Sequence, residues 1–291
     1  MIIELLSQTF VNGINIGALY GLTAVGLSLT FGVMKILNVG HGEFLMVGGY
    51  IGYWLLTLLG IDPFLGLPIV FIALFIFGAV SYKILFSALS GFQEEEKVKN
   101  SLLVGFGLFL VIPQIARLLW TGDERAITPF YSGTSFPLFN VHIAYVPLGG
   151  VVLSIVVILA LHLFLNKTYF GKAVRATSEN WKSAKLMGIN VERTYLITFA
   201  LGTAIAGLGG VIVGLTQAIS PDIGMDWTLK ALIVLVLAGI GSIGGTLIAG
   251  LILGILEAVG AIFLGPYAVA LGLIIFLAIL MFRPQGLFGK A

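Results

Sequence analysis

The sequence contains no cysteine and very little charge. Only 10% of its 291 residues are Asp, Glu, Lys or Arg, whereas soluble domains carry roughly 25%. Hydrophobic residues make up 59%, and the mean hydropathy is +1.11. The lack of cysteine excludes a disulfide framework, a thiolate metal site and a Cys nucleophile. The composition therefore indicates a polytopic membrane protein.

Several catalytic motifs are also absent. The sequence has no G-x-x-x-x-G-K-[ST] nucleotide loop, no H-E-x-x-H and no G-x-S-x-G. We predict that the chain is not an enzyme, does not hydrolyse ATP itself, and has no cofactor or metal site. The net charge of +2 does not suggest a nucleic-acid partner. The first ten residues include Glu4 and lack a basic region, so we expect no removable signal peptide.

Apolar runs long enough to cross a bilayer recur along the chain, since a crossing needs about 20 residues. They predict an all-α helical bundle in a single domain over 1–291, with about eight transmembrane helices. The candidate spans are 9–33, 42–59, 64–90, 101–120, 144–165, 195–219, 228–241, 247–264 and 267–282. Two of them, 228–241 and 247–264, are short and flank GIGSIGGT. They could be one span, two spans, or a broken or re-entrant pair.

The segment 166–193 interrupts these runs with six of the fifteen Lys and Arg residues. Placing it in the cytoplasm, with the spans alternating outward from it, puts twelve of the fifteen cations on the inner side, Lys290 included. This bias predicts an external N-terminus and a cytoplasmic C-terminus. The loops 121–142 and 220–227 then face outward, and the first is long enough for a small structured cap.

Small residues recur every four positions in three spans, and such residues share one helix face. The ridges are Gly13, Gly17 and Gly21; Gly202, Ala206, Gly210 and Gly214; and Gly250, Gly254 and Ala258. Ridges of this kind favour close helix crossings in membranes. They could pack inside the chain or form an interface with a second subunit.

Ionisable and polar residues at membrane depth are candidates for function. Glu257 could pair with a cation such as Lys230 or line a pathway. We expect Glu43 at the inner end of the second span, where Asn38 would cap the helix and Glu43 would complement its dipole. The remaining candidates form a polar stripe on the first span, which could hold helices together or line a water-filled route: Gln8, Asn12 and Asn15.

The basic segment has the features of a short helix. Ser178 could be its N-cap, Glu179 would lie in its first turn, and Gly188 would end it, which gives about nine residues. Three residues would recur on one side of it: Trp181, Ala184 and Met187. A capped helix that exposes Trp and Met favours a docking surface, for a protein partner or for membrane lipid.

Four blocks of the sequence resemble the permeases of branched-chain amino acid ABC importers, closest to the H-type subunit. They are GLSLTFGVMKILNVGHGEFLMVGGYIG, the run from GKAVRATSENW to GGVIVG, LKALIVLVLAGIGSIGGTLIAGLILGILE, and RPQGLFG. The family commonly has an acidic residue and Pro where this chain has Asn180 and Trp181, and Ala where it has Gly40. Related permeases for urea and short amides share the motifs.

The resemblance implies a permease subunit in a prokaryotic inner membrane. Its implied partners are two cytoplasmic ABC ATPases, a second permease subunit or second copy, and an extracytoplasmic binding protein that meets the outward loops. Arg175 to Gly188 would couple ATP hydrolysis to transport, with Ala184 and Gly188 matching the Ala and Gly of importer coupling loops. An ion-coupled transporter that uses Glu257 or Glu43 is the rival interpretation.

Overall fold

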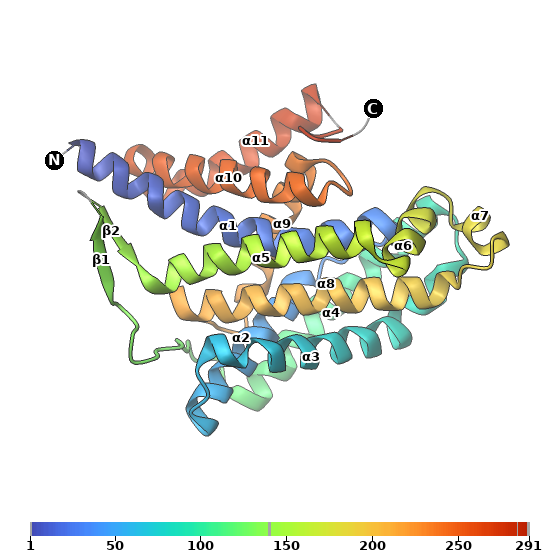
Figure 1. Cartoon of the computed structure of the whole chain (residues 1–291), viewed down its shortest axis with the longest axis horizontal. Helices are drawn as coiled ribbons and strands as arrows, with labels where there is room; N and C mark the ends of the chain where they lie inside the picture. The colour runs from blue at the N-terminus through green and yellow to red at the C-terminus, as the bar shows by residue number, and fades with distance from the viewer. Residues whose placement is uncertain (1, 139–140, 284, 290–291) are drawn as a thin grey trace.

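The computed structural model describes residues 2–138, 141–283 and 285–289, and it is almost entirely helical (Figure 1). Lys290, used above for orientation, lies outside the described residues. The long helices are α1 (Ile2–Met34), α2 (His41–Leu59), α3 (Pro63–Ser81), α4 (Glu94–Trp120), α5 (Tyr145–Lys167), α8 (Val191–Thr216), α9 (Ile223–Ala238), α10 (Ile243–Leu264) and α11 (Val269–Phe282). The short elements are a π-turn η1 (Tyr82–Phe86), 3₁₀ turns η2 (Ser87–Gly91) and η3 (Gly265–Ala268), and helices α6 (Tyr169–Glu179) and α7 (Trp181–Leu186).

The described residues contain seven apolar stretches that could cross a membrane by length and composition. The last stretch, Ile243–Phe282, combines α10 and α11, which are separate helices on either side of η3. The α9 helix has only 16 residues and is not among the seven. These features confirm the predicted all-α membrane bundle. Near 228–264 the chain forms two distinct helices, of which α9 is short.

The glycine ridges pack inside the chain. A Cβ built on Gly17 would lie 2.7 Å from the carbonyl oxygen of Gly250, and one built on Gly254 would lie 2.4 Å from Gly17 Cα. The first and third ridges therefore form one close crossing of α1 and α10. In the second ridge, a Cβ on Gly210 would lie 1.8 Å from the Leu45 carbonyl oxygen of α2. Backbones approach this closely only where side chains are absent.

The segment between α1 and α2 corrects one prediction. Residues 35–40 are not helical and lie along α4, where the Leu37 amide donates to Ser101 Oγ at 3.0 Å. His41 Nε2 lies 3.1 Å from the Thr23 carbonyl oxygen in the interior of α1. The α2 helix therefore begins inside the bundle, not at the inner end of a span. Asn38 accepts from the Gly40 amide at 3.0 Å and does not cap α2.

The two ends of the bundle differ. The N-terminus and an antiparallel ribbon of β1 (Ser135–Leu138) and β2 (Val141–Ala144) lie at one end, and α6 and α7 lie at the other (Figure 1). The ribbon belongs to the loop for which a structured cap is predicted, although residues 139–140 of this loop lie outside the described residues. Burial and the neighbouring Asp62 carboxylate, which accepts from the Tyr131 hydroxyl at 2.7 Å, raise the pKa of Tyr131 in this loop.

Candidate functional site

The basic segment begins with a sharp turn between α5 and α6. Thr168 caps α6 by accepting from the Gly171 amide at 3.0 Å. A Cβ on Gly171 would lie 2.2 Å from the Leu165 carbonyl oxygen, so a side chain cannot be added here without moving the backbone. The turn brings α6 into contact with α1 and α8.

Ser178 is not the N-cap that the spacing predicted, and Arg175, which the resemblance placed in the coupling segment, bonds to the end of α5. Arg175 donates to the Leu165 carbonyl oxygen at 2.9 Å and also to Asn166 Oδ1, and so satisfies groups at the C-terminus of α5. Ser178 lies within α6 and donates to the Arg175 carbonyl oxygen at 2.8 Å. Glu179 is the last residue of α6. The predicted helix is thus divided in two, because Asn180 has extended backbone angles and separates α6 from α7.

Asn180 is the N-cap of α7, and its side chain accepts from the Ser183 amide at 3.0 Å. The helix has six residues, shorter than predicted. It ends in a Schellman motif. The Ile189 amide donates to the Ala184 carbonyl oxygen and the Gly188 amide donates to the Lys185 carbonyl oxygen, both at 3.1 Å. Gly188 has φ of +84°, as its predicted role as the helix stop requires.

The predicted face of α7 is exposed only in part, at Met187. Ala184 is buried, and Trp181 is half-buried with its ring centroid 4.8 Å from the Lys97 ammonium of α4. Lys97 is itself 1% exposed. The exposed apolar side chains at the end of α7 are Leu186 at 88% and Met187 at 84%. The exposed apolar surface of α7 is therefore the Leu186–Met187 pair, while Trp181 packs α7 against α4.

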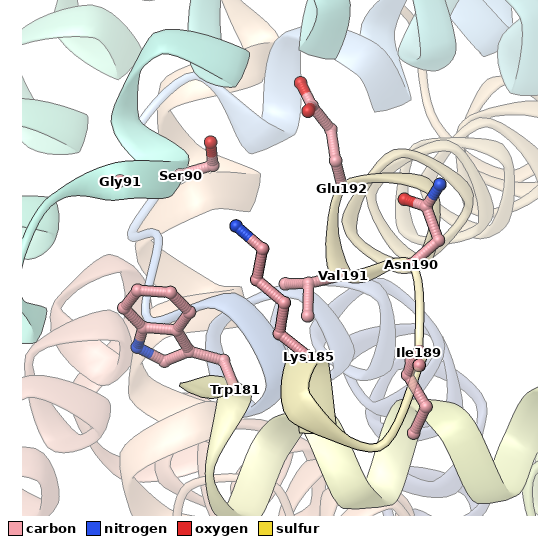
Figure 2. Close-up of a pocket in the computed structure, with 9 residues that line it drawn as sticks. Ser90, Gly91, Trp181, Lys185, Ile189, Asn190, Val191 and Glu192 are labelled. Carbon is pink, nitrogen blue, oxygen red and sulfur yellow. The ribbon is translucent and has the colours of Figure 1, made fainter. Parts of the chain in front are cut away.

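A recess of about 410 Å³ lies beside α7. Figure 2 shows Lys185 extending from α7 into this recess, with Trp181 beside it and Ser90 and Glu192 on the opposite side. The walls come from η2, α7 and the start of α8. A movement of α7 would therefore change its packing against both η2 and the start of α8.

The predicted pathway residues do not converge on one site. Gln8 holds the β2 strand to α1, because it accepts from the His142 amide at 2.9 Å and donates to the His142 carbonyl at 3.0 Å. Asn12 and Asn15 line a separate recess of about 340 Å³ with Thr216 of α8. The polar stripe thus includes both a tie between elements and part of a cavity wall.

The two acidic candidates also differ from each other. Glu257 forms an ion pair with Lys230 of α9 and accepts from the Tyr20 hydroxyl at 2.9 Å. This bears out the predicted pairing with Lys230. Glu43 lies 1% exposed at the start of α2 and lines a third recess with residues of α4 and α9.

Three charged residues were not recognised from the sequence as parts of a site. Lys97 lies in the charged run EEEKVK, which gives no sign that Trp181 covers it. No local pattern distinguishes Arg117 at the end of α4 or Asp222 just before α9. These two form an ion pair at the recess that contains Glu43. A lone Arg at the end of one span and an Asp before another give no signal that they meet.

Comparison with known proteins gives matches over nearly the whole chain. The family described as branched-chain amino acid transport system / permease component matches residues 9–283. The high-affinity branched-chain amino acid transport system permease protein BraD of Pseudomonas aeruginosa is 32% identical, covering 97% of this chain and 95% of BraD. LivH of Escherichia coli, named likewise, is 30% identical with the same coverage. A probable LivH of Methanocaldococcus jannaschii is 32% identical over 92% of this chain and 88% of its own length.

The fold also has a relative among solved structures. A chain of PsaBC from Streptococcus pneumoniae, solved in complex with Fab, superposes with a TM-score of 0.53 over 98% of this chain and 97% of that chain. The two sequences are 16% identical, so this likeness concerns the fold. Together with the match over residues 9–283, the near full-length similarity means that the chain belongs to the family of branched-chain amino acid transport system permease components.

Proposed function

We propose that this chain is a membrane-embedded permease subunit of an ABC importer for branched-chain amino acids. The observation that carries the proposal is similarity to permeases named for this transport over more than nine-tenths of the chain. These names favour branched-chain amino acids over urea or short amides. The buried Lys230 partner of Glu257 favours a structural role for that carboxylate over proton coupling.

The α6–α7 segment would receive the force from ATP hydrolysis on partner subunits. Leu186 and Met187 form an exposed apolar pair at the end of a helix that is capped at both termini. Exposed apolar groups on a rigid support suit a protein groove. Because Trp181 covers Lys97 of α4, a displacement of α7 would pass to α4 as well as to α8.

The proposed assembly contains two ATPases on the side of α6 and α7, and a second permease subunit or second copy. An extracytoplasmic binding protein would dock on the opposite side, where the N-terminus and the β1–β2 ribbon lie (Figure 1). This arrangement places the N-terminus outside an inner membrane and the C-terminus in the cytoplasm. It follows the charge bias, which concentrates Lys and Arg in 166–193.

Cross-linking combined with transport tests the proposal. This chain has no native cysteine, so Met187→Cys provides its single attachment site for a short photo-cross-linker, used in the assembled transporter. We expect it to capture an ATPase subunit, whereas Phe130→Cys, at a side chain 96% exposed in the opposite loop, should not. Leucine uptake should require ATP and the partner subunits. Uptake by this chain alone, driven by an ion gradient, would overturn the proposal.

A further inference from the structure

A third recess of about 250 Å³ opens between α4, α9 and the start of α2. We call it the Glu43 recess. It is built from different elements than the recess beside α7. Its polar residues are Glu43, Gln114, Arg117 and Asp222, and the rest of its lining is apolar.

Glu43 is the buried acid of this recess. It is 1% exposed, and its Oε2 atom has no hydrogen-bond partner within the described residues. A Cβ on Gly224 of α9 would lie 2.2 Å from Glu43 Oε1, so glycine at this position leaves the room that the carboxylate occupies. Burying an acid without a partner is unfavourable. A cationic group of a ligand would supply the missing partner.

Arg117 and Asp222 form an ion pair in the same lining. Their side chains are 38% and 70% exposed, so they lie nearer solvent than Glu43. An exposed pair of this kind contributes little to stability and can open when a competing charge arrives. The planar guanidinium of Arg117 suits a carboxylate, which it can bind through two parallel hydrogen bonds.

The remaining wall of the recess is apolar and comes from Phe109, Leu110 and Pro113 of α4, Pro221 just before α9, and Met225 of α9. Pro113 lies inside α4 and has no amide proton, so it removes the helical donor of the Phe109 carbonyl. Met225 adds a flexible thioether side chain, which adapts to apolar groups of different shape.

We infer that the Glu43 recess binds an α-amino acid as a zwitterion during its passage. Arg117 takes the carboxylate as its pair with Asp222 opens, Glu43 takes the ammonium group, and Phe109, Leu110 and Met225 contact the apolar side chain. This inference deepens the proposed function and rests on it. It assigns a recognition step to the permease itself, in addition to any selection by a binding protein.

Protection of an introduced cysteine tests the inference. Gln114 is exposed and lines the recess, so Gln114→Cys should fold and react with a charged maleimide in the assembled transporter in membrane vesicles. We expect leucine to slow this reaction. Leucinamide, which lacks the carboxylate, and 4-methylpentanoate, which lacks the ammonium group, should give no protection at the same concentration. Phe130→Cys, in an exposed loop, should be unaffected by all three.

Charge-removing variants in the Gln114→Cys background identify the groups involved. Glu43→Gln and Arg117→Gln should each raise the half-protecting leucine concentration by roughly tenfold to hundredfold, the usual effect of losing a charge-assisted hydrogen bond. Asp226→Asn is the matched control, because Asp226 is exposed on α9 and does not line the recess. It should leave the protecting concentration unchanged.

ATP-driven leucine uptake, measured in the same vesicles, distinguishes a failure of this inference from a failure of the proposed function. Normal uptake with no protection of Gln114→Cys by leucine would overturn the inference and leave the proposed function intact. Equal protection by 4-methylpentanoate and leucine would also overturn it, because the ammonium group would then not be recognised. Absence of ATP-driven uptake of any branched-chain amino acid would overturn the proposed function itself.

Discussion

Lys230 of α9 and Glu257 of α10 form an ion pair in the interior of the bundle, with side chains that are 13% and 10% exposed. The Tyr20 hydroxyl of α1 donates to the second carboxylate oxygen at 2.9 Å, and the Lys230 ammonium lies 5.4 Å from the Tyr20 ring centroid. The three groups connect three helices. The charge of the Glu257 carboxylate is therefore compensated within the protein.

Breaking this pair should be more harmful than replacing it. Glu257→Leu leaves a buried ammonium without its carboxylate, and we expect a loss of roughly 3–5 kcal/mol in the free energy of unfolding. The double variant Lys230→Met/Glu257→Leu should recover most of that loss. Thermal unfolding of the purified protein in detergent measures both. A double variant no more stable than Glu257→Leu would contradict the compensation of charge within the pair.

The crossing of α1 and α10 gives a second prediction. Gly250→Ala should destabilise the protein by roughly 1–3 kcal/mol, because its Cβ would lie 2.4 Å from the Gly21 backbone nitrogen. Gly244→Ala is the matched control on the same helix, since no atom lies within 4 Å of its Cβ. That variant should stabilise by about 0.4–1 kcal/mol through the unfolded chain. The same unfolding assay should therefore give opposite signs.

Gly188 should be important for coupling and not for folding. A β-branched residue at φ of +84° costs roughly 1–2 kcal/mol locally, so Gly188→Val should disrupt the end of α7 while the protein remains inserted. We expect ATP hydrolysis to continue with reduced leucine uptake. Gly133→Val carries the same kind of strain at φ of +80° in the outward loop, with open space around its Cβ. Equal uptake in the two variants would argue against coupling through α7.

The contact between Trp181 and Lys97 should hold α7 against the bundle. A desolvated cation–π contact is worth about 2 kcal/mol, so Trp181→Leu should increase hydrogen exchange of the α7 amides by roughly 10- to 30-fold. Lys182 lies on the exposed side, 5.6 Å from the same ring centroid. Lys182→Met should therefore change exchange little, and an equal effect of both variants would contradict the role of Lys97.

Orientation can be measured directly because the chain lacks cysteine. A membrane-impermeant maleimide added to intact cells should label Phe130→Cys, and it should label Met187→Cys only after the membrane is opened. Both side chains are highly exposed, at 96% and 84%, so reactivity is not limited by burial. The reverse labelling pattern would place the N-terminus in the cytoplasm.

Much of the fold was predictable because membrane helices depend on local properties. Apolar length located the spans, and the i, i+4 rule placed the glycines of α1 and α10 on faces that pack together. The pairing of Glu257 with Lys230 was foreseen because a charge at membrane depth needs a partner. The start of α2 was not predictable, since residues 35–40 are stabilised by distant groups such as Ser101.

The sequence by itself determined the membrane class, the positions of most helices and the glycine stop at Gly188. These properties depend on hydropathy and on neighbours within a few residues. Only the tertiary structure decided that Asn180 divides the basic segment, that Leu186 joins Met187 on the exposed face while Trp181 is half-buried, and that Arg117 and Asp222 meet beside Glu43. Those outcomes depend on which helices cross and at what depth, and such long-range packing leaves no local pattern in the sequence.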